Sequence, residues 1–500
     1  MSRKLTIITL LGVLVKHECA NILAVFLAPS LSHQAVFRPI IQELAKKGHS
    51  VTVVTPDPVF KDTKFDNLTE IDLHDVSYAF QSEMYALANI KNTVTQLDIM
   101  FNIFTKTFEA QLQVEDFKNL INDKNKKFDL IIIEAFIQGA LAISHVFKAP
   151  IIQISSFGSH YLNNFIVGST SHPIWYPTSS FQKKTHYHTI WDRLIAFYNE
   201  FMMISIVQKY EKLDDMVIRK YLKSPDIPSL NILKNNVELL MLNVHPIWEN
   251  NRPVPPNVIY LGGLPQQLNK PLPKDLQTFL DSSKHGVIYI SFGTNVNTSL
   301  LPQEKIQTFL KVFSKLPYDV LWKWDNDELE GRPNNVRFGK WFPQSDLLKH
   351  PNIKLFITQG GLQSTDETIL GGVPVIGIPM LGDQWYNVDQ YVRLGIGKHI
   401  EMDDVQEDNL MDAIQLRSTM YDQPNTALER AIYWTEYVIK HKGARHLRAA
   451  GANLAWTEYY QIDIVLLLLS CVVGCLFVLG LLLYYLVKSV TKFNAKVKKE

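Results

Sequence analysis

The chain has 500 residues, too many for one ordinary hydrophobic core, so its length predicts two domains. Apolar residues make up 46% of the sequence and charged residues 20%, which is typical of a globular protein and excludes a long disordered body. The formal net charge of +1 provides no global field for nucleic acid, and no zinc-finger or RNA-binding signature is present, so we expect no nucleic-acid partner.

The beginning of the chain, residues 1–20, has the layout of a signal peptide. Arg3 and Lys4 precede an apolar run over residues 5–15, and a short polar stretch follows. Glu18 stands where a cleavage site prefers a small residue, so the alternative interpretation is an uncleaved first strand.

A strand, a helix and a second strand follow the leader in quick succession. Residues 21–29 form an apolar run, 32–47 have a helical pattern that Gly48 ends, and 51–55 are mostly β-branched. This order predicts a parallel βαβ unit, because parallel strands need a crossover connection.

A similar succession comes later in the first half. Residues 130–133 and 151–154 are short apolar runs, and a helix is predicted between them over 140–147. The aromatic-rich stretch 157–223 has no strand periodicity, so we predict helices that line a cleft.

The second half repeats the alternation of strands and helices. Strands are predicted at 287–292, 320–324, 354–358 and 373–378, with helices at 303–315 and 364–370. Proline and glycine concentrate between the halves, which predicts a linker. Two doubly wound α/β domains joined in this way place their site in the cleft outside the carboxyl ends of the strands.

Residues 464–487 are an uncharged apolar run near the other end. As a helix the run reaches about 36 Å, enough to cross roughly 30 Å of hydrocarbon with some tilt. Five lysines follow it closely, at positions 488, 492, 496, 498 and 499. The positive-inside rule therefore predicts a single-pass type I membrane protein with a cytosolic tail and a lumenal body.

The last residues have two interpretations. Lys496 and Lys498 resemble the dilysine retrieval signal of endoplasmic-reticulum membrane proteins, and the alternative is an ordinary basic flank of the membrane span. Glycosylation sequons at Asn67 and Asn297 are typical of a lumenal body. We expect the chain in the endoplasmic reticulum membrane.

The cysteines are consistent with this division of the chain. Cys19 lies in the leader, and Cys471 with Cys475 lies in the predicted span, so the body can form no internal disulfide and no thiolate metal site. The complete prediction is a signal peptide at 1–20, an N-terminal domain at 21–245, a linker at 246–275, a C-terminal domain at 276–460, a transmembrane helix at 464–487 and a tail at 488–500.

The most specific stretch is 341–384, which reads WFPQSDLLKHPNIKLFITQGGLQSTDETILGGVPVIGIPMLGDQ. Together with the SFGT sequence at 291–294 and the segment before the apolar run, it resembles the UDP-glycosyltransferase family, in particular its membrane-anchored animal members of invertebrate type. The resemblance covers nearly the whole chain, and so long an ordered match is more specific than a lone glycine motif. It implies the α/β fold called GT-B, in which two Rossmann-like, doubly wound domains face a cleft.

The resemblance implies a UDP-sugar site in the second domain. Trp341 can stack on a uracil ring, which is worth about 1–3 kcal/mol, although a core position is the alternative. The glycines after Thr358 let a diphosphate approach backbone N–H groups at a helix start. The family uses the glutamate matching Glu367 on the ribose, where a solvated charge is the alternative, and the pair matching Asp383 and Gln384 on the sugar. The predicted donor residues are Ser291, Thr294, Trp341, Gln344, Thr358, Gln359, Gly360, Gly361, Gln363, Glu367, Asp383 and Gln384.

Gln359 departs from the family's pattern, which usually has histidine at this position. Glutamine still donates a hydrogen bond to a phosphate, but it cannot become cationic. We therefore expect donor binding to be retained, with part of the charge stabilisation lost or supplied elsewhere.

His33 matches the catalytic histidine of the family, at the start of the first helix. Inverting transfer needs a base that takes the acceptor's proton, and a helix N-terminus keeps an imidazole neutral for this role. Glu134 ends a predicted strand in the place of the family's supporting aspartate, where a carboxylate orients the imidazole and stabilises its charged form. The alternative is that His33 is a helix residue without chemistry.

The predicted reaction is inverting transfer of a hexose from a UDP-sugar to a small lipophilic acceptor, for detoxification or clearance, with glucose favoured over glucuronic acid. Five aromatic residues of the middle stretch suggest the lipophilic acceptor: Trp175, Tyr176, Trp191, Phe197 and Tyr198. We expect no metal and no cofactor, because the acidic sequence 325–327 is more typical of a solvated loop. Self-association into a homo-oligomer is compatible with the sequence.

Two other classes of protein compete with the enzyme. A sugar-nucleotide-binding protein that has lost catalysis is the first, and Gln359 is the observation in its favour. Retention of His33 with an acidic partner is evidence against it. A transporter or receptor ranks last, because a single span with a large body forms no transport pathway.

Overall fold

The structure is a computed structural model of the chain. It describes residues 19–60, 65–87, 90, 92–178, 189–222, 224, 226–263, 270–294, 296, 298, 303–326, 329, 331–399, 427–449, 452, 454–459 and 461–497. The contacts divide the chain into two compact units, Met1–Ala449 and Ala450–Glu500. The predicted signal peptide up to residue 18, the Asn297 sequon and the last lysines lie outside the described residues.

The first unit contains a seven-stranded parallel sheet in the order β3-β2-β1-β4-β5-β6-β7. Its strands are β1 (Asn21–Val25), β2 (Ser50–Thr55), β3 (Leu68–Asp72), β4 (Leu130–Glu134), β5 (Ile151–Ser155), β6 (Val237–Leu242) and β7 (Val258–Tyr260). The four central runs β1, β4, β5 and β6 are almost completely buried, as expected for a parallel sheet that is covered on both faces.

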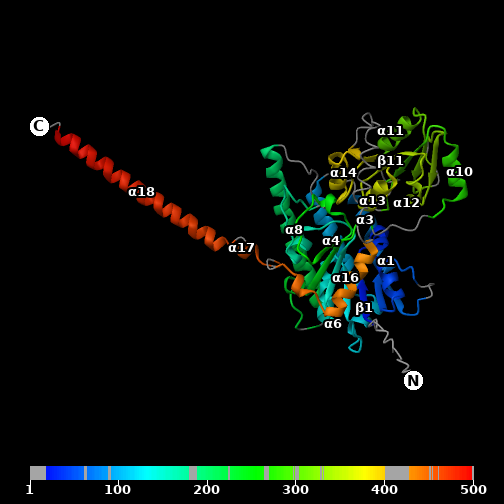
Figure 1. Cartoon of the computed structure of the whole chain (residues 1–500), viewed down its shortest axis with the longest axis horizontal. Coiled ribbons are helices and arrows are strands. Elements are labelled where there is room, and N and C mark those ends of the chain that lie inside the picture. Colours follow the sequence, from blue (N-terminus) through cyan, green and yellow to red (C-terminus); the bar gives the residue numbers. More distant parts are fainter. Residues whose placement is uncertain are drawn as a thin grey trace, which may run out of the picture. The chain divides into compact units, whose positions relative to one another are not determined.

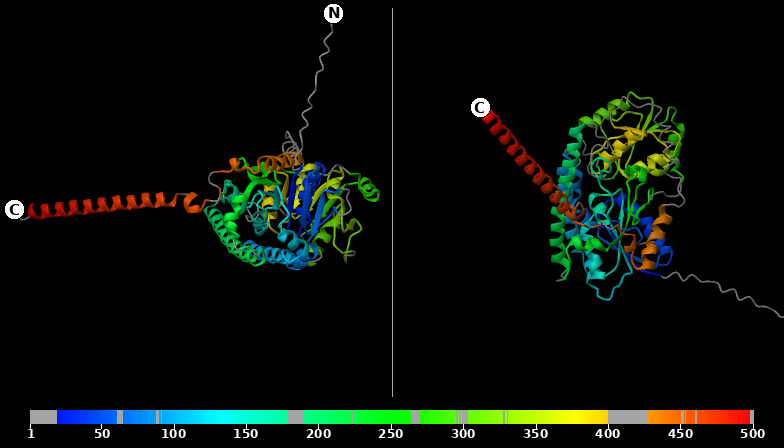
Figure 2. Two further views of the ribbon diagram at one scale, coloured as in Figure 1. Left: turned by 90° about the horizontal axis from the view of Figure 1, so that it is seen from below. Right: turned by 60° about the vertical axis from the view of Figure 1, so that its left-hand side comes forward.

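Helices cover both faces of this sheet (Figures 1 and 2). They are α1 (Leu31–Lys46), α2 (His74–Ser77), α3 (Gln81–Ala86), α4 (Thr93–Gln111), α5 (Glu115–Asn122), α6 (Ile143–Phe147), α7 (Tyr161–Val167), α8 (Ile190–Leu222) and α9 (Leu230–Leu233). In the stretch 157–223 the structure describes the helices α7 and α8, and no strand longer than an isolated bridge among the described residues. The predicted helices are therefore confirmed.

A second parallel sheet of six strands has the order β10-β9-β8-β11-β12-β13. Its strands are β8 (Val287–Ser291), β9 (Asp319–Lys323), β10 (Val336–Gly339), β11 (Ile353–Thr358), β12 (Val375–Gly377) and β13 (Gly397–His399). The helices of this half are α10 (Lys274–Ser282), α11 (Gln303–Phe313), α12 (Gln344–Leu347), α13 (Leu362–Gly371) and α14 (Gln384–Arg393).

Two segments belong to a different part of the fold than the predicted boundaries suggested. β7 lies inside the predicted linker 246–275, yet it pairs with β6 and completes the first sheet. Helix α16 (Ala427–His441) lies inside the predicted C-terminal domain 276–460, yet it contacts α1 and shares the core on that face of the first sheet (Figure 1). Lys47 and Glu436 form an ion pair of 2.9 Å between α1 and α16.

The side chain of Asn67, in the first predicted sequon, is hydrogen-bonded in the folded chain. Its amide nitrogen donates hydrogen bonds to the carbonyl oxygens of Ala45 at 2.7 Å and His49 at 2.8 Å, and the residue is partly buried. A glycan would attach to this nitrogen, so glycosylation at Asn67 would change both hydrogen bonds.

The second unit consists of α17 (Trp456–Tyr459) and α18 (Ile462–Val497). The stretch Ile462–Lys488 has a mean hydropathy of 3.0 over its most apolar window and is long and apolar enough to cross a membrane. None of that window is buried in protein, which is the condition expected of a helix whose solvent is lipid.

Candidate active site

An open cavity lies between the carboxyl ends of the two sheets, with about 1680 Å³ of empty space that is partly continuous with solvent. Its walls come from the start of α1 on one side and from the ends of β8, β9 and β11 on the other. Ten of the twelve predicted donor residues line it: Ser291, Thr294, Trp341, Gln344, Gln359, Gly361, Gln363, Glu367, Asp383 and Gln384. The strand register explains part of this convergence, because Thr358 at the end of β11 pairs with Ser291 at the end of β8.

Thr358 and Gly360 support the cavity and are not part of its lining. Thr358 is fully buried, and its hydroxyl oxygen lies 3.4 Å from the backbone nitrogen of Gly360. Gly360 has φ +86°, and a Cβ there would lie 2.5 Å from a methyl group of Val388. Only glycine tolerates both constraints, so this residue allows the turn that begins α13.

Trp341 lies at the cavity with 69% of its surface exposed, which excludes the alternative that it is a core residue. Its neighbour Gln344 donates a hydrogen bond to Glu367 at 2.7 Å and accepts one from the Tyr289 hydroxyl at 3.0 Å. Burial raises the pKa of Glu367 to about 7, although the bond from Gln344 opposes that rise. Glu367 is therefore a buried, hydrogen-bonded carboxyl group and not a solvated helical charge.

Asp383 belongs to a hydrogen-bonded chain that the sequence did not reveal. Its carboxylate accepts a hydrogen bond of 2.7 Å from Asn387, whose amide nitrogen also donates to the Gly360 carbonyl at 2.8 Å. The Asn387 oxygen accepts from the Trp248 indole at 2.8 Å. Burial raises the pKa of Asp383 to about 6, and the bond from Asn387 counteracts that rise. The spacing of four residues on α14 is the only sequence signal for this pair.

Gln384 and Gln363 have structural bonds in addition to their place at the cavity. The side-chain oxygen of Gln384 accepts the backbone N–H groups of Met380 and Leu381, both at 2.8 Å. Gln363 donates to the carbonyl of Ser156 at 3.0 Å, which joins α13 to the end of β5 across the cleft. Gln363 therefore also holds the two halves together.

Gln359 lies against Gly293 at the end of β8. A Cβ on Gly293 would fall 2.2 Å from the Gln359 amide nitrogen, so glycine is required for this side chain to occupy its position. The side-chain oxygen of Gln359 is buried and has no hydrogen-bond partner among the described residues. The Gln359 amide therefore lies beside Gly293 at the predicted diphosphate position, with its buried oxygen unpartnered among the described residues.

Lys323 is a cavity residue that sequence reasoning missed. Its ammonium group donates to the Gly293 carbonyl at 2.7 Å and lies 3.9 Å from a carboxylate oxygen of Asp325. Burial lowers the pKa of Lys323, and Asp325 opposes that shift. Lys323 is the last residue of β9, which pairs with β8. A cation at the carboxyl end of a central strand was therefore the sequence signal that could have identified this cavity residue.

His33 and Glu134 meet as predicted, although 101 positions separate them. Glu134 is 2% exposed at the end of β4, and one carboxylate oxygen accepts the Ala28 backbone N–H at 3.1 Å. The other oxygen hydrogen-bonds to Nδ1 of His33. The pairing of β1 with β4 explains this contact, because it places the loop that begins α1 beside the last residue of β4. The extra methylene of glutamate does not prevent it.

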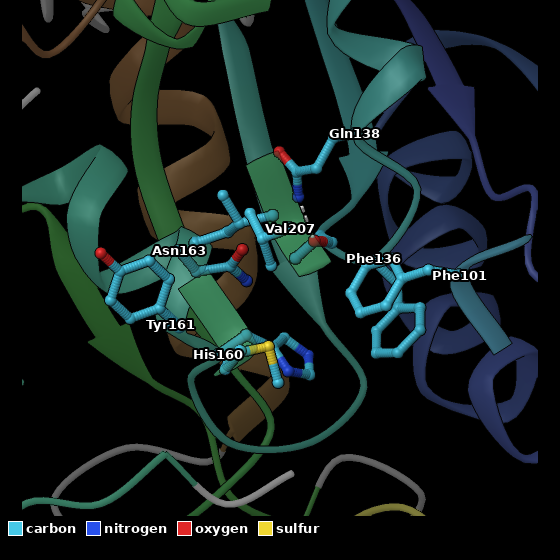
Figure 3. Close-up of a pocket in the computed structure, with 10 residues that line it drawn as sticks. Phe101, Phe136, Gln138, His160, Tyr161, Asn163 and Val207 are labelled. Atoms are coloured by element: carbon cyan, nitrogen blue, oxygen red, sulfur yellow. Dashed lines mark hydrogen bonds between the residues drawn. The ribbon is translucent and has the colours of Figure 1, made fainter. Parts of the chain in front are cut away.

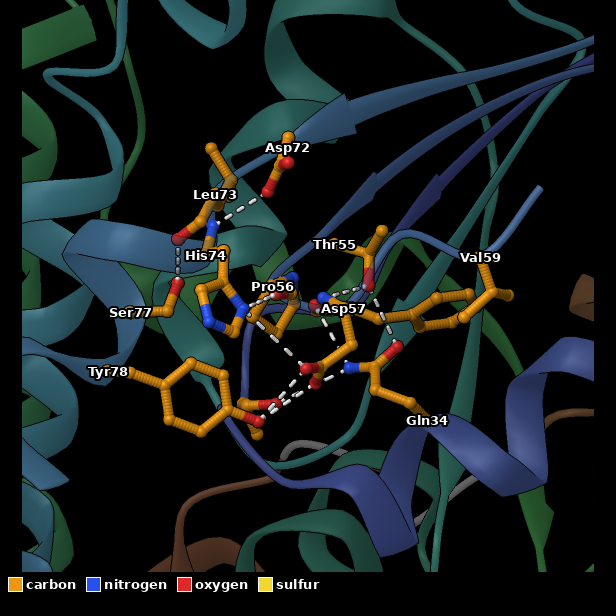
Figure 4. A network of polar contacts seen from close by, with 12 residues as sticks. Gln34, Thr55, Pro56, Asp57, Val59, Asp72, Leu73, His74, Ser77 and Tyr78 are labelled. Atoms are coloured by element: carbon orange, nitrogen blue, oxygen red, sulfur yellow. Dashed lines mark hydrogen bonds and ion pairs between the residues drawn. The ribbon is translucent and has the colours of Figure 1, made fainter. Parts of the chain in front are cut away.

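A polar network supports the first turns of α1 (Figure 4). Gln34 donates to the carbonyl of Ala28 at 3.3 Å and accepts from Thr55 at 3.0 Å. Tyr78 donates to the Asp57 carboxylate, with distances of 2.9 and 3.1 Å to its two oxygens. Burial raises the pKa of Asp57, and Tyr78 opposes the rise. The network joins the ends of β1 and β2 to the first turn of α1, which carries His33.

A second cavity of about 670 Å³ also opens on His33. Its walls are mainly apolar, from Met84, Met100, Phe104, Phe136, Phe157 and Leu381, and it shares His33 and Asp383 with the larger cavity. The rings of Phe157 and Phe136 approach the imidazole edge-on, at centroid distances of 5.2 and 6.2 Å.

The aromatic residues predicted to line the cleft do not line this cavity. Trp175, Trp191, Phe197 and Tyr198 are exposed on the surface, while Tyr176 pairs with His172 in an isolated β-bridge. Aromatic composition marked the correct part of the chain, but it could not distinguish side chains that face a cavity from those that face outward.

A smaller cavity of about 290 Å³ lies behind Phe136 (Figure 3). Gln138, His160 and Asn163 are the polar residues among its mostly apolar lining. Burial lowers the pKa of His160 to about 3, so its imidazole is neutral at physiological pH. The Asn163 amide is fully buried without a hydrogen-bond partner among the described residues.

Within the described ranges, no group of three or more histidine, cysteine, aspartate or glutamate side chains is arranged to hold a metal ion. Asp325, from the acidic sequence 325–327, accepts the backbone N–H and the hydroxyl of Thr298, both at 2.7 Å. Asp325 therefore binds the loop that carries Thr298. Asp327 lies outside the part of the chain that the structure describes.

The two facing sheets with a cleft between their carboxyl ends are the GT-B fold of glycosyltransferases. A UDP-glucose:anthocyanidin 3-O-glucosyltransferase solved in complex with UDP has the same architecture, with a TM-score of 0.56, 16% identity, and coverage of 84% of this chain and 99% of that one.

The family model described as "UDP-glucoronosyl and UDP-glucosyl transferase" matches residues 22–498, so the chain belongs to this family and is a glycosyltransferase. An ecdysteroid UDP-glucosyltransferase of Spodoptera littoralis nuclear polyhedrosis virus is 33% identical, over 93% of this chain and 96% of its own. UDP-glucosyltransferase 2 of Dactylopius coccus is 32% identical, over 94% of each chain.

Proposed function

We propose that this chain transfers glucose from UDP-glucose to a hydroxyl group of a small lipophilic acceptor, with inversion at the anomeric carbon. Sugar transfer from a UDP-sugar is the activity of the family. The observation that supports the finer proposal is the position of the His33–Glu134 pair, because His33 lines both the large cavity and the apolar one.

In the proposed reaction, His33 is the general base. Its Nδ1 is bonded to Glu134, so Nε2 is the nitrogen that takes the acceptor's proton. As the proton leaves, the acceptor oxygen forms a bond to the anomeric carbon and the bond from that carbon to the UDP oxygen breaks. Glu134 keeps the ring oriented and stabilises the imidazolium that forms, and the proton is later released to water.

The donor residues have distinct proposed roles. Trp341 offers an exposed ring to the uracil, and Glu367 with Gln344 offers hydrogen-bond partners to the ribose. Gln359 and the backbone at the start of α13 face the diphosphate. Asp383 and Gln384, which line both cavities, hold the sugar beside His33.

The charges around the sugar position favour glucose over glucuronic acid. The carboxylate of Asp383 would repel the carboxylate of a glucuronosyl group, whereas it accepts hydrogen bonds from the hydroxyls of glucose. Lys323 donates to the carbonyl of Gly293, between the predicted donor residues Ser291 and Thr294, so we assign its charge to another part of the donor. Several relatives are named UDP-glucosyltransferases, which agrees with this choice.

The apolar cavity supports a lipophilic acceptor. The viral relatives are named for ecdysteroids, which makes a steroid the first acceptor to test. The apolar helix α18 supports anchoring in a membrane, and we propose the endoplasmic reticulum membrane with a lumenal body, where such an enzyme serves detoxification or clearance.

Transfer assays with the full-length chain in microsomes test the proposal. UDP-glucose and UDP-glucuronic acid are offered separately with an ecdysteroid and with a simple phenol, and the anomeric configuration of the product is read by NMR. A β-glucoside formed from the α-linked donor is the expected result. Binding of UDP-glucose without transfer to any acceptor would instead favour the catalytically inactive binding protein.

A further inference from the structure

The ring of Phe136 borders three cavities at once. One is the apolar cavity beside His33, and the other two are smaller, with about 290 and 320 Å³ of empty space that is partly continuous with solvent. We call the two smaller cavities together the inner compartment, because they share five lining residues: Phe101, Phe136, Gln138, Leu162 and Val207. The inner compartment therefore adjoins the cavity proposed for the acceptor, with Phe136 as a common wall.

Phe136 occupies this position because it lies in the loop that follows β4. It comes two residues after Glu134, and its side chain is only partly buried, whereas both of its neighbours in the chain are buried. Its ring centroid lies 4.9 Å from that of Phe104, which lines the apolar cavity, and 4.9 Å from that of His160, which lines the inner compartment. Packing alone holds a phenylalanine ring, so a rotation of this side chain would join the two spaces.

Asn163, on α7, presents a buried amide to the inner compartment. The residue is fully buried, and neither the oxygen nor the nitrogen of its amide has a hydrogen-bond partner among the described residues. In Figure 3 the amide faces the side of the cavity on which Phe101 and Phe136 lie. A buried amide of this kind destabilises a fold unless a bound molecule supplies the missing hydrogen bonds. Asn163 is therefore suited to recognise a polar atom of a ligand.

The other polar groups around Asn163 are uncharged. Burial lowers the pKa of His160 to about 3, so its imidazole is neutral at physiological pH. Gln138 donates to the Ala135 carbonyl at 2.7 Å, and its buried side-chain oxygen has no partner among the described residues. Apolar side chains form most of the remaining wall, so a charged ligand would find no opposite charge on this side.

Two carboxyl groups of α8 also line the inner compartment, and both have partners. Asp214 accepts a hydrogen bond of 2.7 Å from the Thr105 hydroxyl, and Glu211 forms an ion pair with Lys234. Both carboxyl groups are thus engaged within the protein. The compartment as a whole therefore favours an uncharged ligand group over a cationic one.

We infer that the inner compartment binds the far end of an elongated acceptor, and that this end carries an uncharged carbonyl or hydroxyl group on an apolar chain. The Asn163 amide can donate to a carbonyl oxygen and accept from a hydroxyl group, whereas a charged end would be buried without a counter-charge. The inference rests on the proposed function, because the other end of the same molecule must present its hydroxyl group to His33. Phe136 is then the residue that determines how long an acceptor the enzyme takes.

Phenols with a linear para substituent test the inference, with UDP-glucose and the full-length chain in microsomes. The substituents increase in length, and each length is made in two forms, one that ends in a methyl group and one that ends in a methyl ketone. A ketone is not a nucleophile, so the phenol hydroxyl is the group that takes glucose in every case. The measured quantity is the ratio of kcat/KM for the ketone to kcat/KM for the alkyl phenol of equal length.

Asn163→Leu removes the amide at nearly constant volume, and Asn164→Leu is its matched control. Asn164 follows on the same helix, is 1% exposed and also has an amide without a partner among the described residues, but it does not line the inner compartment. Transfer to the shortest phenols shows that each variant is folded.

For substituents long enough to pass Phe136, the ratio is expected to fall about 3- to 10-fold in Asn163→Leu and to keep its wild-type value in Asn164→Leu. Phe136→Ala should raise kcat/KM for long alkyl phenols relative to short ones, because it removes the common wall. An unchanged ratio in Asn163→Leu at every length, or an equal fall in both asparagine variants, would overturn the inference while transfer to short phenols upholds the proposed function. A wild-type chain that transfers glucose to no phenol would overturn the proposed function and the inference together.

Discussion

Lys323 is expected to supply the positive charge that Gln359 cannot. The amide of Gln359 and the ammonium group of Lys323 both approach Gly293, at the end of the strand that carries Ser291. A diphosphate bound there can accept a charge-assisted hydrogen bond from Lys323, which is worth about 1.5–3 kcal/mol when the groups are shielded from water. Lys323→Met keeps most of the side chain's length and removes this charge, so the affinity for UDP should fall about 10- to 150-fold.

Calorimetry with two ligands separates the loss of the Lys323 charge from damage to the fold of the cavity. Uridine lacks the diphosphate, so Lys323→Met should leave the affinity for uridine nearly unchanged while it lowers the affinity for UDP. Trp341→Ala is the matched control, because loss of stacking on the uracil should weaken both ligands alike, by about 1–3 kcal/mol. If Lys323→Met weakens uridine as much as UDP, the lysine supports the fold of the cavity and does not contact the phosphates.

Gln359→His provides the second half of this test. In the Lys323→Met background the imidazole should restore part of the lost UDP affinity, and the recovery should grow as pH falls towards about 6, where histidine becomes charged. The helix start opposes protonation, which limits the gain. Gln359→Leu in the wild-type background removes the amide donor and should raise the KM for UDP-glucose. A double mutant no better than Lys323→Met at any pH, together with a leucine variant like wild type, would place Gln359 outside the phosphate site.

Three further outcomes are expected. His33→Ala should lower kcat by about 10²–10⁴-fold with UDP affinity nearly unchanged, and full activity in the folded variant would remove His33 from the mechanism. Asn387→Leu removes a hydrogen bond that lowers the pKa of Asp383 from the raised value caused by burial, so that pKa should rise above about 6. The carboxylate then becomes protonated at a higher pH, so the acidic limb of the pH profile of kcat/KM should shift to higher pH. An unchanged limb would show that the ionisation of Asp383 does not set this limb. Truncation before Ile464 removes the only span predicted within the described residues and should release the body from carbonate-washed membranes.

The secondary structure was predictable where a buried segment is long and continuously apolar. The runs that became β1, β4, β5 and β8 are mostly of this kind, because a parallel strand covered on both faces needs apolar residues at nearly every position. β11 follows the same pattern apart from the exposed Lys354 near its start. β3 was missed because it is polar and only partly buried, and β7 and β13 have three residues each, too few to show a period. β12 is equally short, but it lies inside the longer apolar run that predicted a strand at 373–378. Short strands of this kind are stabilised by their neighbours in the sheet and not by their own sequence.

The sequence by itself determined the family, the two alternating halves, the apolar segment near the end and most of the residues that line the cleft. These features are local, since a motif, a strand run or a hydrophobic stretch is contained in neighbouring positions. The tertiary structure decided which distant groups meet. It brought Glu134 to His33, Lys323 to Gly293 and Trp248 to Asn387, through strand pairing and helix packing that no single segment encodes. It also decided that the aromatic start of α8 faces outward, because the direction of a side chain depends on what the rest of the fold leaves to cover it.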